Sequence, residues 1–126
     1  ELNELLKSMQ PEMQPDDYAF CTVSGKLMDY ADLNPLATFM EQEGLTLILT
    51  AEAADKAKIS YGGVYKQITL TVHSSLEAVG LTAAIATKLT EHGISANVVA
   101  AYYHDHIFVP KDKASLALDA LKSFAA

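Results

Sequence analysis

The segment KQITLTVHSSLEAVGLTAAIATKLTEHG (66–93) constrains the fold most, because a strand pattern runs directly into a helix pattern. Hydrophobic and polar residues alternate strictly over residues 66–73, which predicts a β-strand with one apolar face. The residues on that face are Ile68, Leu70 and Val72. The opposite face carries Thr69, Thr71 and His73.

Residues 74–92 have hydrophobic residues at helical spacing, which predicts an amphipathic helix. Ser74 and Glu77 have the spacing of a capping box at its start. Gly93 suits the left-handed position that ends a helix. One apolar row contains Leu76, Val79, Ala83 and Ala86, with Leu81, Ile85 and Leu89 beside it.

The rest of the second half predicts two strands and a helix. The strands are residues 94–101 and 106–110, joined by a hairpin turn through residues 102–105. Residues 111–125 then form a helix with Asp112 as its N-cap. Its buried stripe is Ala114, Ala117, Leu118, Leu121 and Phe124.

The first half shows a weaker version of the same pattern. Pro11 and Pro15 are expected to end a short N-terminal helix and to lead into a loop. The predicted elements are a helix at 1–9, a strand at 18–23, a turn region at 24–35 with one helical turn, a hairpin of strands 36–42 and 45–50, and a helix at 51–59.

The order of elements predicts an α+β fold in two layers, with helices on one face of an antiparallel sheet. Because the two halves have similar element orders, we predict two similar units, residues 1–65 and residues 66–126.

Charge argues against two classes of partner. The net charge is −7, and all nine basic residues are Lys. Nucleic acid and anionic membrane surfaces are bound mainly through basic patches, often with Arg, so neither is an expected partner. No segment has the length of a membrane span and no signal peptide is evident, so we expect a cytoplasmic protein. Cys21 is the single cysteine, which excludes an intrachain disulfide and fits a reducing compartment.

The sequence His104-Asp105-His106 admits two interpretations. Histidines two apart on a strand share a face and could bind a metal ion, as in a metal-dependent hydrolase. The favoured interpretation is a polar hairpin turn, because Asp tolerates turn geometry and one short motif is weak support for a metal. We therefore expect no metal, no cofactor and no catalytic residues.

The junction at residues 71–80 also admits two interpretations. The free amides at a helix start attract a carboxylate, and Gly80 would allow a ligand to approach closely. The alternative is an ordinary helix start with a glycine at a packing contact.

Residues 68–121 resemble an ACT-type domain, a βαββαβ regulatory module that binds amino acids. The strongest similarity lies in HSSLEAVGLTAAIA and YYHDHIFV. The chain is especially similar to a bacterial family of small stand-alone tandem ACT-like proteins, and more distantly to the CASTOR-type arginine sensors. The resemblance implies a ferredoxin-like sheet in each of two tandem units and a small ligand at an interface.

The resemblance also implies the site residues. The loop from His73 through Ser74 to Ser75, together with Gly80, would line the ligand pocket. Asp105 would be the acidic ligand contact.

The expected function is therefore non-catalytic binding of a small molecule, an amino acid, in a regulatory or sensing role. The alternatives are a structural oligomerisation module without a ligand and, less favoured, a histidine-based metal-dependent enzyme. A homodimer is expected, because open sheet edges are commonly paired in two-fold assemblies.

Overall fold

The structure, a computed structural model, describes residues 2–71 and 79–125. Contacts divide the chain into two compact units. Unit 1 consists of Glu1–Pro15 and Lys66–Ala126, and unit 2 of Asp16–Tyr65. Strand β1 (Pro11–Val23) contributes its first residues to unit 1 and the remainder to unit 2.

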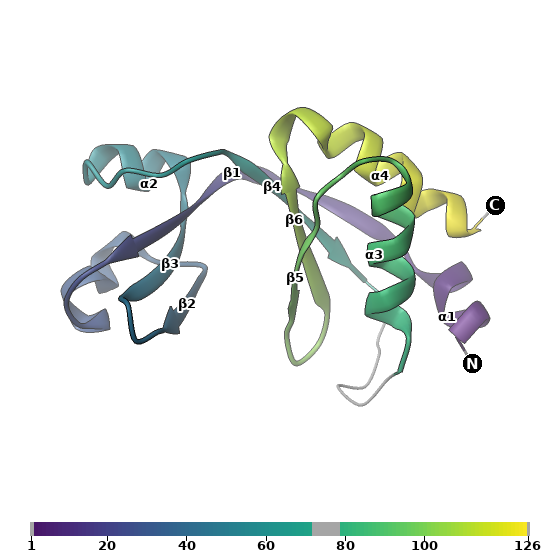
Figure 1. Ribbon diagram of the computed structural model, residues 1–126, viewed down its shortest axis with the longest axis horizontal. Helices are drawn as coiled ribbons and strands as arrows, with labels where there is room; N and C mark the ends of the chain where they lie inside the picture. The colour runs from purple at the N-terminus through teal and green to yellow at the C-terminus, as the bar shows by residue number, and fades with distance from the viewer. Residues whose placement is uncertain (1, 72–78, 126) are drawn as a thin grey trace. The chain divides into compact units, whose positions relative to one another are not determined.

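Unit 1 has strands in the order β1-β4-β6-β5. Helices α3 and α4 both lie on one side of these strands (Figure 1). The elements besides β1 are α1 (Leu2–Ser8), β4 (Tyr65–Leu70), α3 (Leu81–Glu91), β5 (Asn97–Ala100), β6 (Asp105–Pro110), the 3-10 turn η2 (Lys111–Lys113), α4 (Ala114–Lys122) and the 3-10 turn η3 (Ser123–Ala125).

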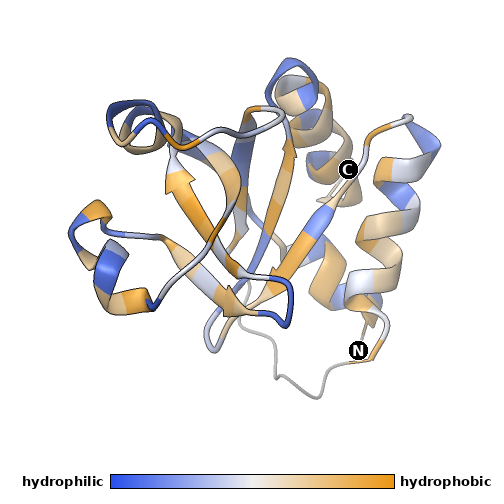
Figure 2. Cartoon of the chain, turned by 60° about the vertical axis from the view of Figure 1, so that its left-hand side comes forward, coloured by the Kyte–Doolittle hydropathy of each residue, from blue (hydrophilic) through white to orange (hydrophobic). Residues whose placement is uncertain are grey.

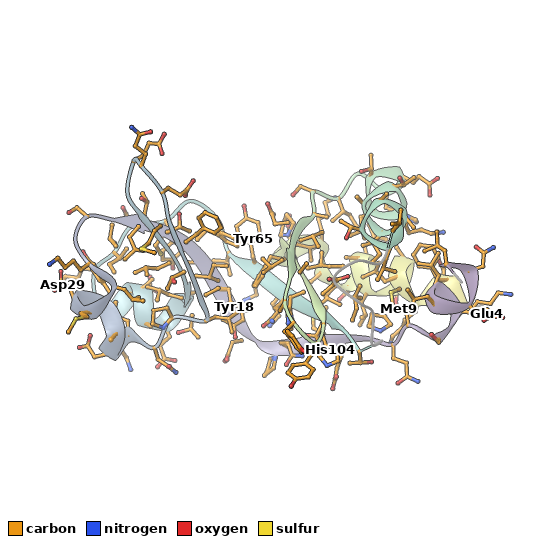
Figure 3. The ribbon with its side chains drawn as sticks, turned by 90° about the horizontal axis from the view of Figure 1, so that it is seen from below. Glu4, Met9, Tyr18, Asp29, Tyr65 and His104 are labelled. Carbon is orange, nitrogen blue, oxygen red and sulfur yellow. The ribbon has the colours of Figure 1, made fainter. Side chains whose placement is uncertain are left out.

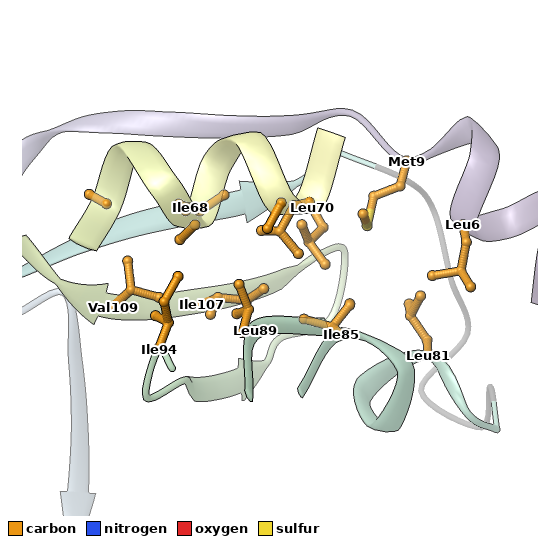
Figure 4. Close-up of a cluster of buried hydrophobic side chains, with 14 residues drawn as sticks. Leu6, Met9, Ile68, Leu70, Leu81, Ile85, Leu89, Ile94, Ile107 and Val109 are labelled. Carbon is orange, nitrogen blue, oxygen red and sulfur yellow. The ribbon is translucent and has the colours of Figure 1, made fainter. Parts of the chain in front are cut away.

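The core of unit 1 fills the space between the sheet and its helices, as Figure 4 shows. The predicted faces of β4 are confirmed, because Ile68 and Leu70 are fully buried in this core. The other main contributors are Leu81, Ile85 and Leu89 of α3, Ile107 and Val109 of β6, and Ala117 and Leu121 of α4.

The N-terminal residues belong to unit 1 because Leu6 and Met9 are buried in the same core. Contacts therefore group residues 1–15 with the second half of the chain, whereas the sequence-based boundary lies at residue 65. The assignment of 1–65 and 66–126 as the two units stays a prediction.

The expected loop at Pro11 and Pro15 is wrong, because both residues lie in β1. The paired residues of β1 and β3 start only at Tyr18, so within residues 2–71 and 79–125 the first part of β1 has β4 as its one strand neighbour. Proline is tolerated there because the side of the strand without a partner needs no backbone donor.

Unit 2 is a smaller sheet in the order β2-β3-β1. It contains the 3-10 helix η1 (Leu27–Leu33), β2 (Ala37–Met40), β3 (Leu45–Thr50) and α2 (Ala51–Lys56). Both strand pairs are antiparallel, which confirms the predicted hairpin. The core lies on one face, beneath α2 and η1, and contains Ala19, Cys21, Leu45, Leu47, Leu49 and Ala54.

Helix α3 begins later than the sequence pattern predicts. Gly80 is its N-cap, with φ 94° and ψ −15°, a left-handed conformation that does not continue a helix. Val79 is 90% exposed, so the predicted row through Val79 and Ala83 is not the buried face. The predicted capping box of Ser74 and Glu77 lies outside the described residues. Gly93 has φ 70°, as predicted for the residue that ends the helix.

Two predictions about the C-terminal elements are also wrong. Asp112 lies within η2, and α4 has Lys113 at its N-cap without a side-chain hydrogen bond. Asp105 is the first residue of β6, so the predicted hairpin turn is shorter than residues 102–105. The buried stripe of α4 is otherwise confirmed, with Leu118 and Phe124 packed at its margin.

The helices carry hydrophilic and hydrophobic residues side by side (Figure 2), as expected for helices with one face in a core. Within residues 2–71 and 79–125, no helix has the length and hydrophobicity needed to cross a membrane.

Candidate functional site

The sequence predicts a ligand site made of His73, Ser74, Ser75, Gly80 and Asp105. The first three lie outside the described residues. The structure describes Gly80, at the start of α3, and Asp105, at the start of β6.

The backbone conformation of Gly80 and the close approach of a neighbouring side chain both favour glycine at this position. A Cβ atom added at Gly80 would lie 3.1 Å from Cδ2 of Leu2 in α1, in addition to the cost of its positive φ. The glycine therefore serves a close packing contact between α1 and the start of α3. This observation favours the packing role among the two interpretations of the junction.

Asp105 is half-buried and lies opposite Ala100 in the β5–β6 hairpin. The backbone N–H of Ala101 donates to the carbonyl of His104 at 3.1 Å, which closes the hairpin at Tyr102 and Tyr103. The rings of these two exposed tyrosines pack edge to face, with centroids 4.9 Å apart. His104, which follows these tyrosines in the chain, is labelled in Figure 3.

A polar cluster spans three neighbouring strands of unit 1. His106 Nδ1 lies 3.0 Å from Gln67 Nε2 and 3.0 Å from Thr69 Oγ1. Gln14 Nε2 donates to Thr69 Oγ1 at 3.1 Å. Because Ile68 and Leu70 face the helices, Gln67 and Thr69 must face the opposite side of the sheet. Both are nevertheless buried, so the cluster depends on these mutual hydrogen bonds.

This environment favours neutral His106. Burial lowers the pKa of His106, the neighbouring His104 lowers it further, and Asp105 opposes these effects. The amide N–H of Gln67 can donate only to a deprotonated Nδ1, which assigns the ring proton to Nε2. Protonation of Nδ1 would place two donors against each other.

We expect unit 1 to lose stability as the pH falls below the ordinary histidine value of 6.5. The pKa of His106 is lowered in the folded state, so the unfolded chain binds the proton more readily. Its contribution is complete above pH 6.5 and is lost as the pH falls through the folded-state pKa. Urea unfolding at a series of pH values should show this loss, and His106→Gln should reduce its slope between pH 7 and 5. At pH 8 the imidazole is neutral in both the folded and the unfolded state. The loss of unfolding free energy in the variant at that pH therefore measures the effect of the substitution on packing and hydrogen bonding, apart from titration. An unchanged slope in the variant would contradict the assignment.

The rings of His104 and His106 have centroids 6.5 Å apart and nearly perpendicular planes. Among residues 2–71 and 79–125, no group of three or more His, Cys, Asp or Glu side chains is placed to hold a metal ion. His106 Nδ1 is engaged by Gln67 and Thr69, which leaves only its Nε2 for any ligand.

A pocket of about 310 Å³ lies in unit 2, where β1 ends and the β2–β3 hairpin turns. One wall is the loop from β1 to η1, which contains Ser24, Gly25 and Lys26. The other wall is the hairpin turn, with Glu41 and Gly44. The apolar part of the lining is Val23, Leu27, Met40 and Leu45.

Sequence reasoning missed both the pocket and the polar cluster. A strand, a short loop with Gly25 and the helical segment η1 follow one another at residues 18–33. The sequence pattern predicts the same order of elements at residues 66–91. That repeated order was a usable signal for a second strand-to-helix loop. The cluster around His106 had no such signal, because strand neighbours cannot be read from local alternation.

Two family models match the sequence, and both are described as ACT domain. One matches residues 1–66 and the other matches residues 64–123. No curated protein matches the sequence.

Solved structures extend this similarity. A Vibrio cholerae protein of unknown function, described as a possible transport protein, is 62% identical, with a TM-score of 0.93 over 99% of this chain and 96% of that one. An Agobacterium tumefaciens protein is 14% identical, with a TM-score of 0.75 over 93% of this chain and 89% of that one. The ligand-free regulatory subunit of Thermus thermophilus aspartate kinase is 9% identical, with a TM-score of 0.63 over 95% of this chain and all 100% of that one. The last two similarities concern the fold alone.

Proposed function

Because this chain belongs to the ACT-domain family, we propose that it is a non-catalytic regulatory or sensing protein that binds an amino acid. The proposed site contains His73, Ser74, Ser75, Gly80 and Asp105. No catalytic group and no cofactor is part of this proposal, and we place the protein in the cytoplasm.

One observation carries the proposal. The 3.0 Å contact between Thr69 Oγ1 and His106 Nδ1 places the start of β6 beside the last residues of β4. Asp105 precedes His106, and Ser74 and Ser75 follow the end of β4 within a few residues of sequence. The start of α3 and the tip of the β5–β6 hairpin also lie toward the same end of unit 1 (Figure 1). This arrangement supports a site to which the loop, Gly80 and Asp105 all contribute.

The chemistry of these groups suits a zwitterion. The hydroxyl and amide groups of the serine loop can donate to a carboxylate, and the Asp105 carboxylate can accept from an ammonium or guanidinium group. A cationic side chain is favoured over an anionic one, because Asp105 would repel a second carboxylate. Binding would favour the arrangement of the chain that encloses the ligand.

The test is a thermal-shift measurement with each of the twenty amino acids, followed by calorimetry on any that bind. An amino acid present at about 100 times its Kd should add about 2.7 kcal/mol to the free energy of unfolding. Asp105→Asn should weaken that binding by about 1.5–3 kcal/mol, because it removes a charged hydrogen-bond acceptor.

Asp112→Asn is the matched control, because Asp112 is an exposed carboxylate of the same unit outside the proposed site. It should leave affinity unchanged. If none of the twenty amino acids binds, the proposed function is wrong and the structural oligomerisation role is favoured. If both variants bind equally well, the protein binds an amino acid but Asp105 is not part of the site.

We also predict a homodimer. The outer strand of unit 2, β2, has no charged residue, and its Phe39 and Met40 are exposed. An apolar edge of this kind invites pairing with a second copy. Light scattering across micromolar concentrations should give twice the chain mass, whereas a single-chain mass throughout would refute the prediction.

A further inference from the structure

The four methionines of the chain differ sharply in their exposure to solvent. Met9 is 3% exposed in the core of unit 1, and Met13 packs against the same core. Met28 in η1 and Met40 in β2 are 86% and 84% exposed. A peroxide can reach a thioether in solvent, whereas a packed core shields it. Unit 2 therefore carries two sulfur atoms that are open to oxidation.

The single cysteine of the chain, Cys21, is a poor competitor for the peroxide. Its side chain lies in the core of unit 2 and is 3% exposed. Burial also raises the pKa of the thiol, so less of the reactive thiolate is present. We therefore expect the first oxidation of unit 2 at methionine and not at cysteine.

Met40 differs from Met28 in its place in the sheet. It is the last residue of β2 and lies opposite Leu45 of β3. Residues that lie directly opposite each other share a face, and Leu45 is buried in the core of unit 2. Met40 thus belongs to the core face of the sheet, but at its outer strand, where it is exposed and lines a pocket with Leu27.

Oxidation of Met40 would change the edge through which two copies are predicted to pair. A strand added beside β2 lies about 5 Å from it, so its side chains contact those of β2. A thioether is apolar and favours such a contact. A sulfoxide is polar, and covering it costs free energy because it loses hydrogen bonds to water.

We propose that Met40 is a site of oxidation by hydroperoxides, and that its sulfoxide weakens the pairing of two copies through β2. With hydrogen peroxide, the sulfur lone pair attacks one oxygen, and the S–O bond forms as the O–O bond breaks. The proton on the transferred oxygen passes to the departing hydroxide, which leaves as water. The sulfur loses two electrons and the peroxide gains two. The inference rests on the homodimer predicted above and is independent of amino-acid binding.

The reactivity of Met40 is tested by adding hydrogen peroxide to the complete chain, at a dilution that favours the single chain over the dimer. Peptide mapping by mass spectrometry should show that Met28 and Met40 gain one oxygen about tenfold faster than Met9 and Met13. Oxidation of Met40 no faster than that of Met13 would overturn the proposal.

The effect on pairing is tested by analytical ultracentrifugation, which gives the Kd of the dimer before and after oxidation. Oxidation should raise this Kd about tenfold, because each copy contributes one sulfoxide to the interface. Treatment with the two methionine sulfoxide reductases, one for each sulfoxide epimer, and with dithiothreitol as electron donor should restore the original Kd.

Leucine is the matched replacement, because it is close to methionine in size and has no sulfur. Met40→Leu should keep its Kd after peroxide treatment. Met28→Leu is the control, because Met28 is equally exposed but belongs to η1 and not to the paired edge. It should lose pairing as the unaltered chain does.

Equal loss of pairing in the two oxidised variants would overturn the role of Met40. A dimer whose Kd is unchanged by oxidation would overturn this inference alone and leave the homodimer standing. A chain that is monomeric before oxidation would refute the homodimer and this inference together.

Discussion

Replacing Leu70 with alanine is expected to lower the free energy of unfolding by about 2–5 kcal/mol. Leu70 ends β4 and is fully buried between the sheet and helices of unit 1. Its neighbours include Met9, Leu81 and Ile85 in one contiguous core. The variant would lose the transfer free energy of the side chain and leave a cavity that the surrounding helices cannot fill completely. Urea unfolding followed by circular dichroism measures this difference.

Leu116→Ala is the matched control, because Leu116 lies in α4 of the same unit but is 43% exposed. Alanine also has a slightly higher helix propensity than leucine, so the control should cost less than about 1 kcal/mol. Equal losses for the two variants would mean that the assigned core face of β4 is wrong.

The elements that sequence analysis identified best are those with a strong local period. The alternation at residues 66–70 predicts β4 and its buried face, and the spacing of Leu81, Ile85 and Leu89 predicts α3. The hydrophobic periodicity of a segment does not predict which other strand or helix that segment packs against. The proline-containing segment at residues 11–15 has no strand signal of its own, and it becomes a strand because β4 lies beside it.

The boundaries of elements were less predictable for a related reason. Ser74 and Glu77 form a good capping pattern, whereas Gly80 is at the N-cap of the helix as described. A glycine can adopt the left-handed conformation at a helix N-cap or lie inside a helix. The residue type is the same in both cases, so sequence alone does not distinguish the two roles. Asp112 illustrates the same problem, because a preferred capping residue lies inside the 3-10 turn that precedes α4.

Among the candidate site residues, too, some can be found from local sequence patterns and others depend on segments that are distant in sequence. Gly80 and Asp105 could be selected from the resemblance to a family, since each belongs to a recognisable local pattern. The cluster of Gln14, Thr69 and His106 joins three strands that are distant in sequence. The pocket of unit 2 likewise joins the end of β1 to a hairpin turn some 15–20 residues later in the chain. Such sites follow from strand order, which local patterns do not contain.

Unit 2 depends on a small core, and Leu47 is its central residue. Leu47 is fully buried in the middle strand of the β2-β3-β1 sheet, opposite Cys21 of β1 and Thr38 of β2. The core also includes Ala19 and Ala54, whose small side chains offer little volume to fill a cavity. We therefore expect Leu47→Ala to destabilise unit 2 by about 2–5 kcal/mol.

Hydrogen exchange distinguishes this loss from the loss caused by Leu70→Ala. In the Leu47 variant, the amides of β3 should exchange faster, because opening of unit 2 exposes the strand at its centre. In the Leu70 variant, the amides of β6 should exchange faster instead. Leu36→Ala provides the matched control, because Leu36 precedes β2 and is 45% exposed, and it should leave exchange in β3 nearly unchanged. If Leu47→Ala and Leu36→Ala accelerate exchange in β3 equally, the buried cluster of unit 2 does not stabilise that unit, and the preformed pocket that depends on it loses its physical basis.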